Sequence, residues 1–455
     1  MSYNSFHHAL KILEDVCIGC THCIKVCPTE ALRVKQGVAV LSEDRCVDCG
    51  ECMRSCPVNA IIVEQDDFSR IFDFKYRVAI VPSVFIGQFP RNIPTREIYS
   101  ALHELGFTHV FEAEHGTRLL SQEIEKYQAE HPRIKPLISS FCPAVVRLVQ
   151  VKFPSLVENI ILLKAPIDIA ALAYRKRLND EGAPDPEIGL FYITPCAAKI
   201  AAVKSPVGER ISLINGVINM NFLFNKVYGL IKKSDKVSCP LPEKEQLRDK
   251  EMLWSLTHGE TGFAGGRSLA IDGIENVIEF LEKLENNSLG IFDFLELRAC
   301  DQSCAGGILT VSNRFLTTER LINRAQKFLD DGRINNTRNG TVDRYEDSLR
   351  ENIRIDEVRA RSGMKLDEKI SNALKKMQKS HEIFNQLPGV DCGVCGAPNC
   401  MALAEDIAQG NAKITDCIFI TSTDIAQNKL SVREAMEIRE NIWGKEKFRN
   451  TGTEK

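Results

Sequence analysis

The stretch Cys17-Ile-Gly-Cys20-Thr-His-Cys23-Ile-Lys-Val-Cys27-Pro28 determines the organisation of this chain, because the same spacing returns shortly afterwards. The second copy has its cysteines at Cys46, Cys49, Cys52 and Cys56 and again ends in a proline. Both stretches, called here the first and second cysteine runs, read C-x2-C-x2-C-x3-C-P. Four soft thiolates at such spacings suit an iron–sulfur cluster, since one loop then wraps around most of the cluster. The chain therefore begins with an internal repeat typical of metal binding.

Eight further cysteines form two more sets of four, so that sixteen of the seventeen cysteines belong to such groups. The central cysteine set is dispersed along the chain and consists of Cys142, Cys196, Cys300 and Cys304. The C-terminal cysteine set, spaced C-x2-C-x4-C-x16-C, consists of Cys392, Cys395, Cys400 and Cys417. Cys239 is left over, and we expect it to be a plain thiol. This use of thiolates predicts electron transfer.

Length and charge restrict the class of protein. A chain of 455 residues is too long for one core and predicts several domains. With 58 basic and 61 acidic residues the net charge is −3, which argues against nucleic-acid and membrane-surface binding. The first residues lack a signal-peptide pattern, and no stretch approaches the roughly 20 apolar residues of a membrane helix. Because the cytosol keeps thiols reduced, the cysteines indicate metal rather than disulfides in a cytoplasmic protein.

From residue 77 the pattern changes to alternating strands and helices, which predicts an α/β multidomain fold. We expect strands at 78–81, 136–138, 189–194 and 291–297, and helices at 95–105, 117–127 and 274–284. The predicted divisions are a ferredoxin-type unit at 1–66, a central α/β domain at 77–330, a linker and helix at 331–375, a small helical cluster domain at 376–435 and a tail at 436–455.

The two cysteine runs resemble bacterial ferredoxins, small α+β proteins with two [4Fe–4S] clusters, in which the fourth cysteine of each run binds the other cluster. The resemblance implies one cluster on Cys17, Cys20, Cys23 and Cys56. It implies a second cluster on Cys46, Cys49, Cys52 and Cys27. Zinc is the alternative, since CxxC pairs also make zinc sites, but the complete double run with both prolines favours iron–sulfur clusters.

The central cysteines follow strand-like runs, and ligands collect at the carboxyl ends of strands in open α/β sheets. Spacing alone leaves open that they are small buried hydrophobic residues. Their segments read SSFCP (139–143), TPCAAK (194–199) and LRACDQSCAGG (297–307). Together these resemble the [FeFe]-hydrogenase family, whose signatures are TSCCP, MPCxxK and CxxxCxxGG. The resemblance covers the ferredoxin-type unit and residues 77–325, and GFAGGRS at 262–268 reinforces it.

The family resemblance implies a two-lobed α/β domain whose central cysteine set holds the [4Fe–4S] part of an H-cluster. Cys304 would bridge to a di-iron subsite with carbon monoxide, cyanide and a dithiolate amine. Lys199 falls on the family's lysine that contacts a cyanide ligand, and Pro195 on a residue whose backbone lines the pocket. A buried cation beside an anionic ligand is physically sensible.

Several positions depart from the family pattern. Phe141 replaces the cysteine that passes protons, and a phenyl ring neither donates nor accepts a proton. Thr194 and Arg298 replace two methionines that pack around the di-iron subsite. We therefore do not expect fast hydrogen turnover. Three carboxylates upstream of Phe141 are either members of a proton path or solvated helix residues, namely Glu112, Glu114 and Glu123.

The C-terminal cysteine set resembles the small helical [4Fe–4S] domain of electron-transport complex subunits and corrinoid proteins, with zinc again as the alternative. Within the hydrogenase family this module marks a slow, sensory branch, here without a following PAS domain. The resemblance implies slow interconversion of H2 with protons and electrons, or sensing of H2 or redox state. The implied partner is an electron carrier such as ferredoxin or a signalling protein. The alternative is an electron-transfer or regulatory protein with [4Fe–4S] clusters only.

Overall fold

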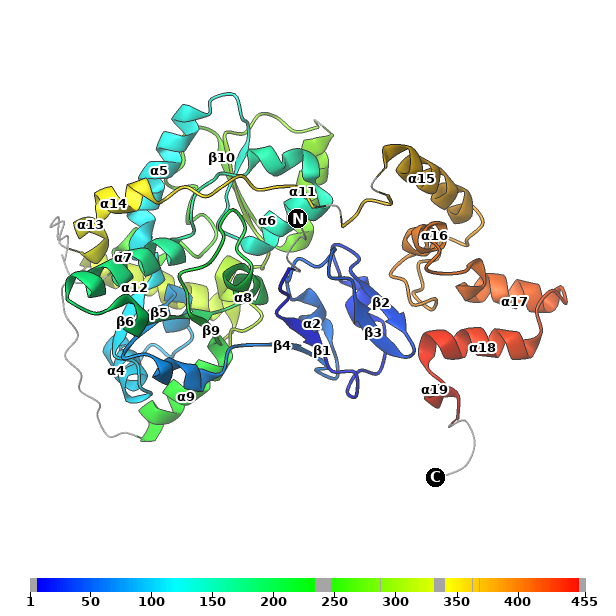
Figure 1. Ribbon diagram of the computed structural model, residues 1–455, viewed down its shortest axis with the longest axis horizontal. Helices are drawn as coiled ribbons and strands as arrows, with labels where there is room; N and C mark the ends of the chain where they lie inside the picture. The colour runs from blue at the N-terminus through cyan, green and yellow to red at the C-terminus, as the bar shows by residue number, and fades with distance from the viewer. Residues whose placement is uncertain are drawn as a thin grey trace. The chain divides into compact units, whose positions relative to one another are not determined.

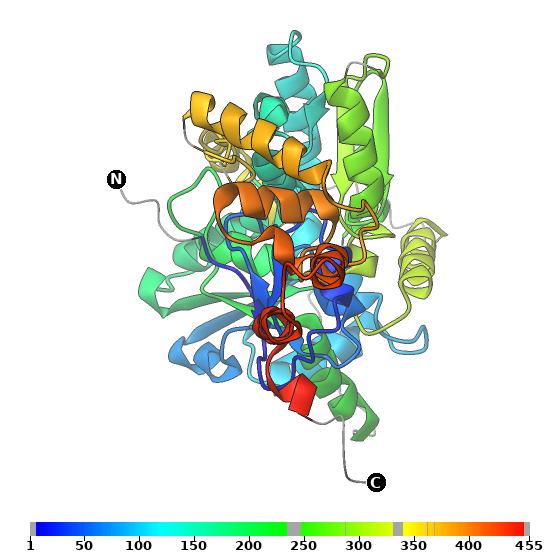
Figure 2. The ribbon, with the colours of Figure 1, turned by 90° about the vertical axis from the view of Figure 1, so that its right-hand side faces the viewer.

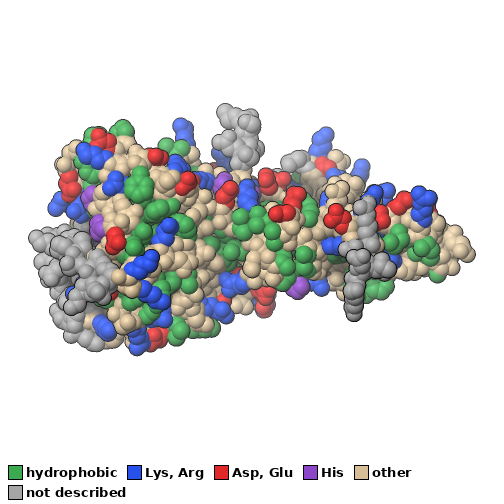
Figure 3. All heavy atoms as spheres, turned by 90° about the horizontal axis from the view of Figure 1, so that it is seen from below, with side chains coloured by type: hydrophobic (Ala, Val, Ile, Leu, Met, Phe, Trp, Pro, Cys, Tyr) green, Lys and Arg blue, Asp and Glu red, His purple; other side chains and the backbone are tan. Residues whose placement is uncertain are grey.

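The computed structural model describes residues 6–233, 247–286, 288–330, 340–361, 363–367 and 369–449. Cys239 and the start of the predicted linker, residues 331–339, lie outside the described residues. The chain forms two compact units (Figure 1). The central unit comprises Met1–Ala9 and Glu64–Arg359, and the cluster unit comprises Leu10–Val63 and Ala360–Lys455. On the face shown in Figure 3, basic and acidic side chains are interspersed, as expected from the near-neutral charge.

A four-stranded parallel sheet with the order β6-β5-β8-β9 forms the first lobe of the central unit. Its strands are β5 (Tyr76–Val81), β6 (His109–Glu112), β8 (Ile188–Thr194) and β9 (Gly216–Asn219). Strand β8 is buried along its whole length, as is usual for parallel strands covered on both faces. Helix α7 (Pro166–Asp180) packs on β5, β6 and β8, and α9 (Met220–Lys233) packs on β8 and β9. The first lobe is therefore an α/β layer structure.

A three-stranded parallel sheet with the order β10-β11-β7 forms the second lobe. Its strands are β10 (Ser268–Asp272), β11 (Phe294–Arg298) and β7 (Leu137–Ile138). Helix α11 (Ile274–Glu285) packs on β10 and β11, and α6 (Pro143–Lys152) packs on β11. The predicted two-lobed α/β arrangement is confirmed, and the expected helices are present as α4 (Thr95–Glu104), α5 (Thr117–Glu130) and α11.

The cluster unit contains a small α+β part and a helical part. In the α+β part, β1 (Leu10–Ile12) pairs with β4 (Ile61–Val63), β2 (Leu32–Lys35) pairs with β3 (Val38–Leu41), and the short helices are α1 (His22–Lys25) and α2 (Glu51–Ser55). Figure 2 looks onto the helical part, which comprises α15 (Ile370–Phe384), α16 (Cys400–Gln409), α17 (Ile418–Ala426), α18 (Val432–Trp443) and α19 (Glu446–Arg449). Asn399 caps α16 by accepting a hydrogen bond from the Ala402 amide, and Gly410 ends the helix with φ 84°.

The two parts of the cluster unit hydrogen-bond through their backbones. The Val34 amide of β2 donates to the Gly396 carbonyl at 2.8 Å. The Gln36 and Gly37 amides donate to the Asn441 and Ile442 carbonyls of α18 at 3.0 and 2.9 Å. The segment predicted as a tail from residue 436 thus includes helical residues that bind the ferredoxin-type part. Among the described residues, no helix combines the length and apolar character required to span a bilayer.

Candidate functional site

The central cysteines lie in the loops that follow β7, β8 and β11. Cys142 precedes Pro143, the first residue of α6, and Cys196 occupies the position before α8 (Ala197–Lys204). Cys300 and Cys304 share the loop after β11. The cysteines therefore lie at the carboxyl ends of parallel strands, where such sheets place their ligands.

Three of these thiols lie close together in space. Burial raises the pKa of Cys196 to about 12; Lys199 lowers it, and neighbouring Cys304 and Cys142 raise it. The Lys199 Nζ atom donates to the Cys304 Sγ atom at 3.6 Å. Burial lowers the pKa of Lys199. The negative charges of the Cys304 thiolate, the Tyr192 phenolate and the neighbouring thiolates of Cys196 and Cys142 more than compensate, so that the pKa lies well above its usual value. The site is a half-buried group of soft sulfur donors with the Lys199 ammonium group in contact.

Close backbone packing holds the Cys304 loop in place. A Cβ atom on Gly306 would lie 1.8 Å from the Asp301 carbonyl oxygen, and one on Gly307 would lie 2.5 Å from the Pro195 carbonyl oxygen. Only glycine fits at these two positions, which accounts for the Gly-Gly pair after Cys304. Pro195 also accepts the Leu309 amide at 2.9 Å, so the loops after β8 and β11 are directly connected.

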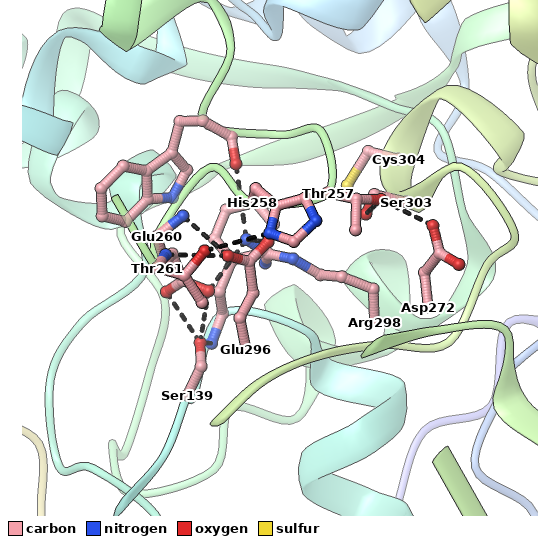
Figure 4. A network of polar contacts seen from close by, with 12 residues as sticks. Ser139, Thr257, His258, Glu260, Thr261, Asp272, Glu296, Arg298, Ser303 and Cys304 are labelled. Atoms are coloured by element: carbon pink, nitrogen blue, oxygen red, sulfur yellow. Dashed lines mark hydrogen bonds and ion pairs between the residues drawn. The ribbon is translucent and has the colours of Figure 1, made fainter. Parts of the chain in front are cut away.

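Hydroxyl and carboxylate groups fix the turn that precedes Cys304 (Figure 4). Thr257 donates to Asp272 at 2.6 Å and shares a hydrogen bond of 2.9 Å with the Ser303 hydroxyl. Asp272 also accepts the Gln302 amide at 3.1 Å. Gln302 and Ser303 have φ values of 61° and 52°, a left-handed conformation that needs such support. Thr194, at the end of β8, similarly donates to the Cys196 carbonyl at 3.0 Å.

Phe141 lies between two cations. The Lys199 Nζ atom is 4.6 Å from the centroid of its ring, and the Arg298 guanidinium carbon is 3.9 Å from it. Both distances fall within the range of cation–π attraction, which strengthens when the partners are desolvated. The substitutions at 141 and 298 that depart from the family pattern are therefore in direct contact, and we call this arrangement the Phe141 stack.

Arg298 belongs to a buried charge network (Figure 4). It is 1% exposed, and its Nη2 atom lies 2.8 Å from Glu260 and 3.5 Å from Glu296. Glu260 accepts from the Ser139 hydroxyl at 2.8 Å, and burial raises its pKa to about 7, with Arg298 lowering it and Glu296 raising it. Within the described part of the chain, the Arg298 Nε and Nη1 atoms have no hydrogen-bond partner. Two buried donors thus lie near the thiols of Cys304 and Cys142.

The three candidate proton-path carboxylates are buried, and two form ion pairs. Glu112 binds the Arg324 guanidinium through two contacts of 2.7 and 2.9 Å, and Glu123 pairs with Arg350. Glu114 instead accepts the Ser83 amide at 2.9 and 3.0 Å. Burial and the adjacent Glu112 raise the pKa of Glu114 to about 7. Of the three, Glu114 has the proton affinity suited to exchange near neutral pH.

The N-terminal thiols group across the two runs. Burial raises the pKa of Cys23 to about 12, and the neighbouring thiols that add to this effect are Cys17, Cys20 and Cys56. Burial also has the largest effect on the pKa of Cys52, and the second largest comes from Cys27 of the first run. Cys27 is a neighbour of Cys46 and Cys49 as well. Backbone amides point at sulfur, with Ala31 and Ala60 donating to Cys27 and Cys56 at 3.2 Å each. The structure therefore brings together the two crossed groups of four.

The C-terminal cysteines line one small cavity. Its walls include Cys392, Cys395, Cys400 and Cys417, together with Leu403 and Phe419. Burial raises the pKa of Cys395 to about 11, and Cys392 and Cys417 contribute. This group, too, converges on one point.

Three family models match the chain. Residues 10–60 match the 4Fe-4S dicluster domain, residues 387–419 match an Fe-S cluster domain, and residues 75–235 match the iron only hydrogenase large subunit, C-terminal domain. By these matches the central part of the chain resembles the [FeFe]-hydrogenase family. It is flanked by an N-terminal part that resembles ferredoxin-type dicluster domains and a C-terminal part that resembles an iron–sulfur domain.

Curated relatives match this chain over limited segments. The NADP-reducing hydrogenase subunit HndD of Solidesulfovibrio fructosivorans is 26% identical over 200 residues, covering 42% of this chain and 31% of that protein. Iron hydrogenase 1 of Clostridium pasteurianum is 29% identical over 147 residues, covering 29% and 25%. The large subunit of the corrinoid/iron-sulfur protein of Moorella thermoacetica is 36% identical over 63 residues, covering 14% of each chain. The matches span less than a third of each of these three relatives.

Solved [FeFe]-hydrogenase structures align over the greater part of the chain. One, described for oxygen inactivation of the H cluster, has a TM-score of 0.47 at 16% identity and covers 65% of this chain and 96% of that one. A variant of apo HydA1 from Chlamydomonas reinhardtii has a TM-score of 0.47 at 13% identity, covering 62% and 94%.

The sequence did not predict Glu260 or Glu296 as residues of the site. Glu296 precedes Arg298 by two positions on β11, so the two side chains share a face of the strand. A pair of opposite charges on one face of a buried strand was the available signal. Glu260 lies in a loop and carried no such signal.

Replacing Arg298 by Met should destabilise the protein, because Glu260 and Glu296 would lose their buried cation. Breaking such a pair costs about 3–5 kcal/mol. The double variant R298M/E260Q should regain part of the loss, since it removes one of the two carboxylates left without a cation, while Glu296 keeps the hydrogen bonds from the Glu260 and Thr261 amides. The thermal midpoint of the cluster-loaded protein measures both effects. A double variant no more stable than R298M would contradict the network.

Replacing Glu114 by Gln should change how stability depends on pH. The folded-state pKa of about 7 lies above the ordinary 4.5, so this group's contribution to stability is complete below about pH 4.5 and is lost as the pH rises through 7. E114Q has no proton to lose, so its free energy of unfolding should decline less between about pH 5 and 8, by up to about 3 kcal/mol, and its thermal midpoint should fall less over the same range. The exposed Glu125 provides a control, E125Q, which should follow the wild type. An unchanged decline in E114Q would refute the assignment.

Proposed function

We propose that this protein interconverts H2 with protons and electrons slowly, or senses H2 or redox state, at a site built on the central cysteine set. The observation that carries the proposal is the contact of Lys199 Nζ with Cys304 Sγ at 3.6 Å, within a half-buried group of thiols at the strand ends. Soft sulfur donors of this kind suit iron. Cys142, Cys196, Cys300 and Cys304 would hold a [4Fe–4S] cluster, and Cys304 would also bind the di-iron subsite.

The residues around the cysteines define the limits of this chemistry. The di-iron group, when bound, supplies the centre at which H2 is formed or split. Lys199 holds a positive charge where an anionic ligand requires one, and Pro195 and Thr194 fix the cysteine loops. Phe141 blocks proton transfer at the position where the family places a cysteine, so turnover is slow. Slow turnover is sufficient for a sensor, which only has to bind H2 and change its redox state.

The remaining twelve ligand cysteines would hold three [4Fe–4S] clusters that carry electrons. Two of these are the crossed clusters of the cysteine runs, and the third is on the C-terminal set. The partner would be an electron carrier such as ferredoxin, or a redox-signalling protein, in the cytoplasm.

A second candidate function is electron transfer or regulation with [4Fe–4S] clusters only. The Phe141 stack favours it, because an aromatic ring between two cations fills space beside Cys304. In that case Lys199 and Arg298 would offset the negative charge of a cluster with four thiolate ligands.

Infrared spectroscopy separates the two functions. Protein matured anaerobically with the di-iron assembly machinery should show sharp carbon monoxide and cyanide stretches that shift under H2. Replacing Cys304 by Ala should abolish them, whereas C239A, which alters the cysteine outside all four sets, should retain them. A blank wild-type spectrum with all cubanes present would establish the cluster-only function instead.

Replacing Phe141 by Cys should raise hydrogen evolution, because a thiol at this position can pass protons. General acid–base groups contribute about 10²-fold or more to a rate. The matched control is F141A, which removes the ring and offers no proton, and it should give no comparable gain. Equal rates for F141C and F141A would show that the proton path is interrupted elsewhere as well.

A further inference from the structure

The C-terminal cysteine set contacts the ferredoxin-type part through the residues next to its cysteines. Gly396, beside Cys395, accepts the Val34 amide at 2.8 Å. A Cβ atom at Gly396 would lie 2.3 Å from the Val34 carbonyl oxygen, so the two backbones approach as closely as glycine permits. Beside Cys392, a Cβ atom at Gly393 would lie 3.5 Å from the Cε atom of Lys25. The loop that carries Cys392 and Cys395 thus lies against Lys25 and against Val34 of β2.

The third contact is polar and leads toward Cys27. Asn399, beside Cys400, donates to the Glu30 carboxylate at 2.7 Å. Glu30 is followed by Ala31, whose amide donates to the Cys27 Sγ atom at 3.2 Å. Asn399, Glu30 and Ala31 therefore join the C-terminal group of thiols to the second crossed group, which includes Cys27.

Independent interactions hold this contact in a fixed geometry. Arg33 of β2 binds Asp406 of α16 through two hydrogen bonds of 2.6 and 3.2 Å. Bidentate pairs of this kind restrict orientation as well as distance. The Trp443 indole of α18 donates to the Val394 carbonyl, between Cys392 and Cys395, at 3.0 Å. The contact is part of the fold of the cluster unit rather than an incidental touch.

We propose that electrons pass directly between the C-terminal cluster and the ferredoxin-type cluster bound by Cys27, across the contact of Asn399 with Glu30. The proposal rests on the cluster loading proposed above. In each step one cluster goes from [4Fe–4S]⁺ to [4Fe–4S]²⁺ and the other from [4Fe–4S]²⁺ to [4Fe–4S]⁺, so one electron moves and no bond is broken. The C-terminal site is then a member of the electron path and not a separate appendage.

Electron paramagnetic resonance of the full, cluster-loaded chain tests this proposal. With all cubanes reduced by a low-potential europium(II) chelate, the C-terminal cluster should show spin–spin splitting from its neighbour. The variant C395S/C417S, which removes that cluster, identifies its signal. After partial reduction and rapid freezing, the electron should be found distributed between the two clusters. Separate, unsplit signals in the wild type, with each cluster reduced on its own timescale, would overturn the proposal.

Reversing the charges of the Arg33–Asp406 pair tests whether the electron path depends on the contact between the two parts of the cluster unit. R33E should weaken or abolish the splitting at unchanged iron content, and R33E/D406R should restore it by reversing the pair. The control R433E alters a pair on the surface of α18, where the Arg433 side chain is 89% exposed, and should keep the splitting. Splitting that survives in R33E and in the Gly396→Ala variant, which forces the backbones apart, would also overturn the proposal.

Infrared spectroscopy and electron paramagnetic resonance test the hydrogen function and the electron path separately, so either proposal can fail without the other. A blank infrared spectrum with split resonance signals would remove the hydrogen function and leave this electron path. Carbon monoxide and cyanide bands together with unsplit signals would do the reverse.

Discussion

Crowding of buried thiols is the constraint on which the rest of the structure depends. Burial and neighbouring sulfur raise the pKa of Cys23 and Cys196 to about 12 and that of Cys395 to about 11. At neutral pH such groups hold their protons, and iron must displace them on binding. Backbone amides are aimed at sulfur in these loops, as the Ala31 amide is at Cys27. The cluster loading proposed above would therefore be linked to folding through these loops.

Around the central set the chain adds the cation Arg298 to the lysine that the family pattern already has, and the contacts of Arg298 account for two of the departures from that pattern. A thiolate-bound cluster is negatively charged, and the buried cations Lys199 and Arg298 lie near the thiols on which the central cluster is proposed. The charge of Arg298 would be costly without Glu260 and Glu296. The ring of Phe141 lies against both cations, so a phenyl group is favourable where a thiol would leave them without an aromatic face. The substitutions at 141 and 298 therefore act together.

Much of this arrangement was predictable from the sequence. The apolar runs of β5 and β8 predicted buried parallel strands. The positions of the central cysteines after strand-like runs, together with the family resemblance, predicted which segments would converge. The union of the ferredoxin-type and C-terminal parts was not predictable, because Arg33 and Asp406 are far apart in the chain and an ion pair leaves no periodic pattern. Glu260 was missed for a similar reason, since only the folded loop brings it to Arg298.

The contact between the ferredoxin-type part and the C-terminal helical part of the cluster unit matters for reactions that move electrons in pairs. Forming or splitting one H2 molecule transfers two electrons, whereas each cubane carries one. A carrier protein that delivers single electrons must then dock twice, unless the protein stores the first electron. The three clusters proposed for the cluster unit, two of them joined through Asn399 and Glu30, would hold both electrons at once. The slow hydrogen site proposed above would gain most from such storage, because the electrons would wait for protons that Phe141 cannot supply.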